Sequence, residues 1–395
     1  MTDIMEGIRI LDFSQEIQGP WGTAMLADMG AEVIKVERRL TGEMTRHARA
    51  DGGVSAYFTV HNRGKKSITL DVKKPEAVKI IHEIAATSDV IVNNWRIGVL
   101  DRLGFGYEQL KEIKPDIIFL SSTTFGPKGP WAHKPGRDTL GQAAGGLMHV
   151  TGMEDDYPLP AGALVGDHAS GIVVALAVLA ALRYRDQTGH GQRVDTSLYG
   201  TVMAMQAWEI SQRAIVGTEM ERAGRNHSFA LKGAWGAFKT ADGFICMAGV
   251  MPDNWDAFCE ALDSPGLLAD PRFALPEVRQ ANADALQDEL DTIFVTRTSD
   301  EWLQRLEAAE QLVAPIQTYD EVIESEQAIV NGYIETIDDP THGPLRVVGT
   351  PVSMSEAKIA VRGPAPELGQ QTEELLLELG YSWEDIARLR DDEVI

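Results

Sequence analysis

The N-terminal segment contains a strand, a helix and a second strand in the order that a parallel sheet requires. Residues 8–13, mostly apolar, have the pattern of a buried strand, and residues 21–29 follow as a helical stretch that ends at Gly30. Residues 31–37 then have the pattern of a second strand. Two neighbouring parallel strands need a crossover connection of this kind, usually a helix packed on the sheet. The segment therefore predicts the start of an α/β domain.

The same alternation continues along the chain. We expect further strands at residues 67–70, 89–92, 116–121 and 193–196. We expect helices at residues 75–86, 107–114, 171–185 and 198–216. The middle of the 171–185 stretch is apolar on all faces, which indicates a buried helix. Together these elements predict an α/β fold with an open sheet of the Rossmann type.

The pattern changes after Arg225. A hairpin is expected around residues 241–243, followed by helices at 254–262, 281–295 and 299–309. The last part of the chain shows short strands near residues 345–348 and 351–353 and a helical tail at 372–379 and 382–389. We expect a discontinuous, Rossmann-like large domain at 1–205 and 330–395 and a smaller α+β domain at 225–325. Residues 206–224 and 326–329 are expected to be linkers.

The chain is acidic, with 36 Lys and Arg against 59 Asp and Glu and a formal net charge of −23. Such a field repels nucleic acid and anionic lipid, so we expect neither a nucleic-acid nor a membrane partner. The two cysteines, Cys246 and Cys259, lack the spacing of metal ligands. No signal-peptide pattern is evident, and the longest apolar run, residues 172–182, is too short to span a bilayer. These features predict a cytoplasmic protein without a metal.

Three common motifs are absent from the sequence. The turn after the first strand, residues 15–20, lacks the glycines that let a backbone approach a dinucleotide pyrophosphate. The chain has no GxxxxGK[ST] phosphate-binding loop. It also has no GxSxG turn for a serine nucleophile. Nicotinamide binding and serine hydrolysis are therefore not expected.

Basic residues nevertheless gather in the N-terminal part of this acidic chain. Lys35, Arg38 and Arg39 end the second strand, at the edge where α/β sheets bind ligands. A second group lies at residues 62–66, and Arg96 and Arg102 flank Asn94 and Trp95. Each group alone is typical of a solvated surface. Several in one domain favour a polyphosphate ligand.

Asp167 stands out because it lies between Gly166 and the buried helix. One interpretation is structural, because an aspartate before a helix is a favoured N-cap. The other is chemical: a helix dipole favours the ionised carboxylate, and a carboxylate beside glycine can approach a substrate closely as a nucleophile. His168 is either a base or simply a solvated side chain. The residues alone leave both pairs of alternatives open.

Several segments resemble one enzyme family along nearly the whole chain. They lie at residues 7–13, 19–20, 26–38, 62–71, 94–96, 100–107, 126–130, 166–167, 188–195 and 364–369. In these segments the chain resembles the class III CoA-transferases, a group that includes formyl-CoA transferase, carnitine CoA-transferase and acyl-CoA racemases. The resemblance implies an enzyme that moves CoA from an acyl-CoA donor to a carboxylic acid acceptor.

The resemblance also implies a structure and a site. The subunit is expected to have two domains around a central opening and to form an interlocked homodimer. Asp167 is expected to be the nucleophile, passing through an acyl-aspartyl anhydride and an aspartyl-CoA thioester. CoA, the substrate carrier, needs no metal and no nicotinamide in this chemistry. The expected CoA contacts are Arg38, Leu70, Lys73, Asn94, Trp95 and Arg102.

Three departures from the family pattern bear on the substrate. Formyl-CoA transferase has a glutamine where this chain has Ile17, with Gln18 one place later, and a glycine-rich loop where this chain has residues 226–232 without a glycine run. Formyl and oxalyl substrates are therefore not expected. Arg137 replaces the tyrosine of many members and the catalytic histidine of the racemases. We expect Ile17, Gln18, Arg137 and His168 to face the substrate, with Arg137 holding the distal carboxylate of a dicarboxylic acid such as a succinyl-type substrate. The alternative is that Arg137 pairs with Asp138 or another neighbouring acid.

Three alternatives to CoA transfer between two acids are an acyl-CoA racemase, a silent CoA-binding subunit and an intramolecular transfer. An acyl-CoA racemase needs a base beside the α-carbon, and arginine stays protonated in proteins, so Arg137 argues against it. A catalytically silent CoA-binding subunit would not need Asp167. Transfer of CoA between the two carboxyl groups of one dicarboxylic acid stays open, as do the identities of donor and acceptor.

Overall fold

The computed structural model describes residues 3–48, 53–227, 229 and 232–395. Its contacts divide the chain into two units. The first comprises Met1–Gly145, Gly162–Met205 and Ser325–Ile395, and the second Gly146–Ala161 and Gln206–Glu324. Residues 146–161, expected in the large domain, group with the second unit. The side chain of Arg222 explains this, because it donates hydrogen bonds of 3.1–3.4 Å to the carbonyl oxygens of His149, Met153 and Glu154.

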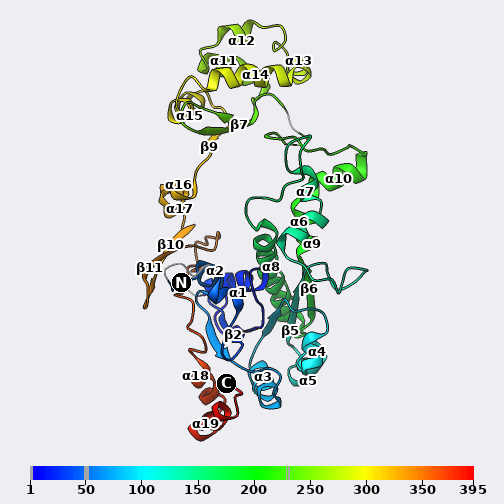
Figure 1. The fold of residues 1–395 in the computed structure, drawn as a ribbon, viewed down its shortest axis with the longest axis vertical. Helices are drawn as coiled ribbons and strands as arrows, with labels where there is room; N and C mark the ends of the chain where they lie inside the picture. The colour runs from blue at the N-terminus through cyan, green and yellow to red at the C-terminus, as the bar shows by residue number, and fades with distance from the viewer. Residues whose placement is uncertain (1–2, 49–52, 228, 230–231) are drawn as a thin grey trace. The chain divides into compact units, whose positions relative to one another are not determined.

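The first unit is built on a six-stranded sheet with the order β3-β2-β1-β4-β5-β6. Figure 1 labels β2, β5 and β6 of this sheet and the helices α1, α3 and α8 of the same unit. Its strands are β1 (Arg9–Asp12), β2 (Glu32–Glu37), β3 (Lys66–Thr69), β4 (Val90–Asn93), β5 (Ile118–Thr123) and β6 (Arg193–Ser197). Neighbouring strands run parallel, and Leu11 of β1 lies opposite Ile34 of β2 and Ile91 of β4. The predicted α/β fold with a parallel sheet is confirmed. The strand order is that of the doubly wound nucleotide-binding folds.

Side chains alternate along each strand, so the sheet has two apolar faces. Ile10 belongs to a core with α1 (Gln18–Asp28) and α8 (Val165–Thr188). Leu11, the next residue, belongs to the opposite core, formed with α3 (Pro75–Ala86), α5 (Tyr107–Ile113), α18 (Thr372–Glu378) and α19 (Trp383–Asp391). Covering both faces with helices explains why consecutive residues are apolar in both strands, namely Ile10 and Leu11 in β1 and Val90, Ile91 and Val92 in β4.

Shorter elements of the first unit connect these layers. They are η1 (Met44–His47), α2 (Ala56–Asn62), α4 (Val99–Leu103), α6 (Asp138–Ala144), α9 (Leu198–Met205) and α17 (Glu326–Val330). The unit also has an antiparallel hairpin of β10 (Ile334–Asp339) and β11 (Gly343–Val348). The strand expected near residues 351–353 is wrong, because β11 pairs with the preceding segment instead. The helix expected at 198–216 is also broken: α9 ends at Met205, and α10 (Ala207–Val216) belongs to the second unit.

The second unit has a three-stranded antiparallel sheet of β7 (Trp235–Lys239), β8 (Phe244–Ala248) and β9 (Val313–Pro315). Its other elements are α7 (Leu147–Val150), η3 (Pro252–Asn254), α11 (Trp255–Ala261), α12 (Pro265–Ala269), α13 (Pro276–Ala281), α14 (Ala283–Phe294), α15 (Ser299–Ala308) and α16 (Tyr319–Glu324). The hairpin expected around residues 241–243 is confirmed. Phe238, Phe258, Phe294 and Trp302 are fully buried between this sheet and its helices.

Helix α8 begins at Val165, six residues before the expected start at residue 171, and ends at Thr188. Within the described residues it is the one helix long and apolar enough to cross a membrane by length and composition. Half of its apolar stretch is buried inside the structure, where Val174 and Val178 pack in the core with α1. A core helix of a globular protein meets the same criteria, so this finding carries no argument for a membrane.

Candidate active site

The strand order reverses direction between β1 and β4. After β1 the sheet grows through β2 and β3 on one side, and β4 is followed by β5 and β6 on the other. The loops that leave the carboxyl ends of two such strands diverge and form a crevice where ligands bind. In this chain the loops are residues 13–17 after β1 and residues 94–98 after β4.

Hydrogen bonds hold these two loops together. Asn94 Nδ2 donates to the Gln15 carbonyl oxygen at 2.6 Å, and the Gln15 N–H donates to Asn94 Oδ1 at 2.9 Å. The Trp95 indole N–H donates to the Phe13 carbonyl oxygen at 2.7 Å. Asn94 and Trp95, expected as CoA contacts, therefore fix the loop after β1 by side-chain bonds to its backbone. The crevice has a defined shape before any ligand arrives.

Two cavities meet along these loops. The larger has a volume of 780 Å³ and is lined by five of the six expected CoA contacts, namely Arg38, Leu70, Lys73, Trp95 and Arg102. The other has a volume of 520 Å³ and is lined by Glu16, Ile17, Gln18, Asn94, Arg137 and Asp167, among others. Gln15, Arg38, Trp95 and Val99 line both. The structure thus brings the expected CoA residues and the expected nucleophile to one continuous crevice within the first unit.

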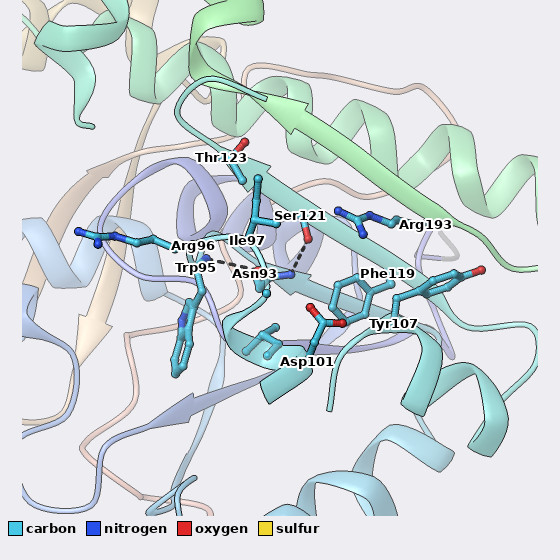
Figure 2. Close-up of a pocket in the computed structure, with 12 residues that line it drawn as sticks. Asn93, Trp95, Arg96, Ile97, Asp101, Tyr107, Phe119, Ser121, Thr123 and Arg193 are labelled. Atoms are coloured by element: carbon cyan, nitrogen blue, oxygen red, sulfur yellow. Dashed lines mark hydrogen bonds between the residues drawn. The ribbon is translucent and has the colours of Figure 1, made fainter. Parts of the chain in front are cut away.

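A third, small cavity of 30 Å³ lies beneath the loop after β4 (Figure 2). Asn93 is central to it: its Nδ2 donates to Ser121 Oγ at 3.0 Å, and its Oδ1 accepts from the Trp95 N–H at 3.3 Å. In Figure 2, Trp95 and Arg96 lie on one side of Asn93, and Tyr107 and Arg193 lie on the other. Such a volume holds about one or two waters, so this cavity supports the loop and is too small for a substrate.

Asp167 lies in the first turn of α8 and is buried, with 8% of its surface exposed. The expectation that it is the N-cap is wrong, because Leu164 occupies that position and has no side-chain cap bond. Instead, Asp138 at the start of α6 supplies the cap, since its Oδ1 accepts the Asp167 backbone N–H at 2.9 Å. A side chain at Gly166 would lie 3.0 Å from this same oxygen, so glycine permits the close approach of α6 and α8.

The charge state of Asp167 differs from the expectation that the helix dipole keeps it ionised. Burial, followed by the nearby carboxylates of Asp138 and Glu16, raises the pKa of Asp167 to about 7, while Arg137 acts in the opposite direction. Desolvation and like charges both favour the neutral acid, which is the opposite of the effect expected from a helix dipole. A carboxylate with this pKa is a better nucleophile than an ordinary aspartate and still ionises near neutral pH.

Arg137 directly precedes α6 and lines the same cavity as Asp167. Its Nη2 lies 3.4 Å from Glu16 Oε1, and 72% of its side chain is exposed. Asp138, one of the partners considered for Arg137, is engaged elsewhere, with Gln142 and with the Asp167 N–H. Arg137 therefore pairs with a neighbouring acid, as the alternative prediction has it, and that acid is Glu16 and not Asp138.

Ile17 and Gln18 both line this cavity from the start of α1. Ile17 is 2% exposed, and the Gln18 side-chain oxygen accepts a hydrogen bond from Ser122 Oγ at 2.7 Å. His168 lies elsewhere: its Nε2 is 3.3 Å from His61 Nε2, and its ring packs edge-on against Trp21. The structure thus directs His168 toward α1 and α2 and not toward the lining of the Asp167 cavity. Residues 228, 230 and 231 of the loop compared with the glycine-rich segment lie outside the described residues.

Several basic residues that suggested a phosphate site are buried and form ion pairs inside the first unit. Arg63 and Lys65 are fully buried and pair with Asp28 at 2.6 Å and Asp12 at 3.0 Å. Lys35 is also buried, donates to the Ser14 carbonyl oxygen at 2.9 Å and pairs with Glu43. The assignment of Arg63 and Lys65 to a polyphosphate site is wrong, because a buried cation needs an internal partner and both have one. Lys35 lines the larger cavity, but its ammonium group is already bonded to Ser14 and Glu43.

Three other cations remain for a ligand. In the part of the chain that the structure describes, Arg38, Lys73 and Arg102 form no ion pair with a carboxylate, and all three line the larger cavity. Sequence reasoning missed two acidic residues of the site, Glu16 and Asp138. The signal for Asp138 was its place beside Arg137. Nothing local marks Glu16, whose approach to Arg137 depends on the fold.

The chain matches the family described as CoA-transferase family III over residues 5–372. It therefore belongs to that family, and the predicted enzyme class is confirmed.

Named relatives and a solved structure agree with this assignment. The chain is 35% identical to succinyl-CoA:glutarate CoA-transferase of Mus musculus, over 95% of this chain and 86% of the relative. It is 32% identical to formyl-CoA:oxalate CoA-transferase of Rhodopseudomonas palustris, over 99% of this chain and 97% of the relative. A crystal structure of a CaiB/BaiF family protein from Brucella suis superposes with a TM-score of 0.87 at 30% identity, covering 96% of this chain and all of that one.

Proposed function

We propose that this chain moves CoA from an acyl-CoA donor to a carboxylic acid acceptor with Asp167 as the nucleophile. The observation that carries the proposal is the position of Asp167, a buried carboxylate in a cavity that continues into a larger basic cavity. Membership of a CoA-transferase family supplies the reaction class. The position of Asp167 in this cavity supports it as the nucleophile of that reaction.

The proposed reaction exchanges one thioester for another through two intermediates. The ionised Asp167 attacks the thioester carbonyl of the donor, which releases CoA thiolate and leaves an acyl-aspartyl anhydride. The thiolate then attacks the aspartyl carbonyl, which releases the donor acid and leaves an aspartyl-CoA thioester. The acceptor carboxylate reverses both steps, so the enzyme and its aspartate are regenerated. The Val165 and Asp167 N–H groups already donate to the Ala163 carbonyl oxygen and to Asp138, so at the start of α8 we assign the oxyanion donor to the Gly166 N–H.

We place CoA in the larger cavity of what we infer to be a Rossmann-like domain. Its phosphates would be held by Arg38, Lys73 and Arg102, and its apolar parts by Leu70 and Trp95. Because the whole chain carries a charge of −23, three unpaired cations in one cavity are a strong local exception. Asn94 and Trp95 would act mainly by fixing the loop after β1.

For the acceptor we propose a dicarboxylic acid whose distal carboxylate binds Arg137. Arg137 is exposed within the cavity that Asp167 lines, and a guanidinium can hold a carboxylate by two parallel hydrogen bonds. The name of the Mus musculus relative includes the dicarboxylic acid glutarate. The name of the Rhodopseudomonas palustris relative includes oxalate, also a dicarboxylic acid but a much shorter one.

We further propose that the chain works as an interlocked homodimer in the cytoplasm. The outer face of α8 supports an interface, because Ile172, Leu176 and Tyr184 are 48%, 64% and 46% exposed in the single chain. Exposed apolar side chains that recur along one helix are typical of a contact surface. Neither a nucleic acid nor a membrane is part of the proposal.

Mass spectrometry of the CoA-ester pool tests the proposed reaction. The protein would be incubated with succinyl-CoA and a mixture of mono- and dicarboxylic acids, beside Asp167→Asn and the exposed control Asp155→Asn. New acyl-CoA species that persist in Asp155→Asn and vanish in Asp167→Asn would support the proposal and name the acceptor. Equal transfer by both variants would overturn the role of Asp167. A pool unchanged by the wild type with every donor tested would overturn the transfer itself.

A further inference from the structure

Glu16 has a backbone conformation that is unusual for its residue type. Its φ is 64°, in the left-handed region, where a glutamate is rarely found without a structural cause. The residue lies in the loop after β1, between Gln15 and Ile17, and lines the cavity of Asp167. Strain at a cavity wall is a reason to ask what the side chain does there.

The surrounding bonds explain how the strain is maintained. The Glu16 N–H donates to Glu43 Oε1 at 2.9 Å, and the preceding residue is held by the two bonds between Gln15 and Asn94. Glu43 is itself buried and paired with Lys35. The loop is therefore fixed on both sides of the crevice, and the conformation of Glu16 follows from these contacts.

This conformation places the Glu16 carboxylate next to Arg137. The pair forms a single contact of 3.4 Å, longer than an ideal charged hydrogen bond, and Arg137 is mostly exposed. Such a pair is weak and can be displaced by a better ligand. The Glu16 carboxylate thus occupies the position beside Arg137 where the distal carboxylate of a substrate would bind.

We propose that Glu16 is an internal competitor that occupies Arg137 in the empty site and is displaced by the distal carboxylate of the substrate. The inference rests on the proposed function, in which Arg137 binds that carboxylate. A dicarboxylic acid can make two parallel bonds to the guanidinium and so replace the single long contact of Glu16. A monocarboxylic acid has no group for Arg137 and leaves the pair intact. Glu16 thus lowers the affinity for dicarboxylates alone.

The test is the acceptor KM in four proteins: wild type, Glu16→Gln, Arg137→Ala and the double variant. Glutarate serves as the dicarboxylate and butyrate as the monocarboxylate, at pH 8.5, above the pKa of about 7 that Asp167 has in the wild type. Glu112→Gln, an exposed exchange on α5, is the matched control for the loss of one negative charge. We expect Glu16→Gln to lower the glutarate KM about two- to fivefold, as for the loss of an exposed ion pair, with the butyrate KM unchanged and any change in kcat equal for the two acceptors. In the Arg137→Ala background the same exchange should have no effect.

Other outcomes overturn the inference in distinct ways. An unchanged or higher glutarate KM in Glu16→Gln excludes competition. An equal gain for butyrate, or a gain that survives in Arg137→Ala, indicates a general effect of charge. Should Glu16→Gln fail to fold, Glu16→Gly accommodates the positive φ and is expected to give the same result.

Failure of the proposed function would look different. If the wild type transfers no CoA, calorimetric binding of glutarate to wild type and Glu16→Gln still measures the competition. If Arg137→Ala leaves the glutarate KM unchanged, the proposed acceptor site is wrong and the inference falls with it.

Discussion

Two buried aspartates of the same unit, Asp12 and Asp167, have opposite electrostatic environments. Asp12 lies at the end of β1, where burial disfavours its ionised form. The charges of Lys65 and Lys35 and the hydroxyls of Ser14 and Thr23 outweigh burial and lower the pKa of Asp12 to about 2. At Asp167, burial together with Asp138 and Glu16 raises the pKa to about 7, and Arg137, which acts in the opposite direction, does not offset them. Both carboxylates are buried, so the neighbouring charged and polar groups determine the direction in which each pKa shifts. Asp12 is held as a permanent anion for the fold, and Asp167 is left reactive.

The largest expected effect of breaking this contrast is on catalysis. Asp167→Asn should lower kcat at least about a thousandfold, because an amide cannot form the anhydride. Stopped-time assays of acyl-CoA exchange, with Asp155→Asn as the control, measure it. Near-normal turnover in Asp167→Asn would remove Asp167 from the reaction.

The next largest effect concerns the stability that Asp12 provides. Asp12→Asn should lower the free energy of unfolding by about 3–5 kcal/mol, because Lys65 would stay buried without its counter-ion. Urea denaturation at pH 7 measures the change. A loss within about 0.5 kcal/mol, typical of a surface exchange, would mean that Lys65 finds another partner.

The same exchange at Asp167 should act in the opposite direction. Its pKa is higher in the folded chain than the ordinary value of 3.8, so the folded state binds more protons, and stability falls as pH rises from about 4 to about 7. Asp167→Asn should therefore be more stable than the wild type above pH 7, by about 2–4 kcal/mol, and equal to it below pH 4. Denaturation at pH 4 and pH 8 gives the difference. A variant that is less stable at pH 8 would show that Asp167 is stabilised as an anion.

The smallest effect is on the pH dependence of the reaction. The nucleophile must be ionised, so kcat/KM should rise with pH and reach half its maximum near pH 7. Glu16→Gln removes one negative charge beside Asp167 and should move that midpoint to lower pH by a fraction of a unit. Initial rates from pH 5 to 9 at low acyl-CoA provide the profile. A midpoint near pH 4 in the wild type would contradict the environment described for Asp167.

Much of the fold could be predicted because its signals are local. The strand at residues 8–13, the helix after it and the strand at residues 31–37 follow from apolar periodicity and the glycine at position 30. The bounds of α8 could not, because Asp138 from another helix caps its first turn. A cap from a residue far away in the sequence leaves no trace in the local pattern.

The site shows the same division. The family resemblance singled out Asp167 as a candidate nucleophile, but only the fold brings Arg137 and Glu16 to the same cavity. The roles of Arg63 and Lys65 could not be read from the sequence, because a basic run at the surface and one paired with buried aspartates have the same composition. Long-range ion pairs decide which cations are free, and they form only in three dimensions.

The last residues of the chain also bear on how the protein is made. Leu375, Leu376, Ile386 and Leu389 complete one face of the sheet, and the Asp71 N–H donates to the Val394 carbonyl oxygen at 2.8 Å. A ribosome that adds residues at about 5–20 per second will have released β1 to β6 many seconds before these helices emerge. During that interval the part of this face that α18 and α19 cover stays exposed beside α3 and α5, a period in which a chaperone would be most useful.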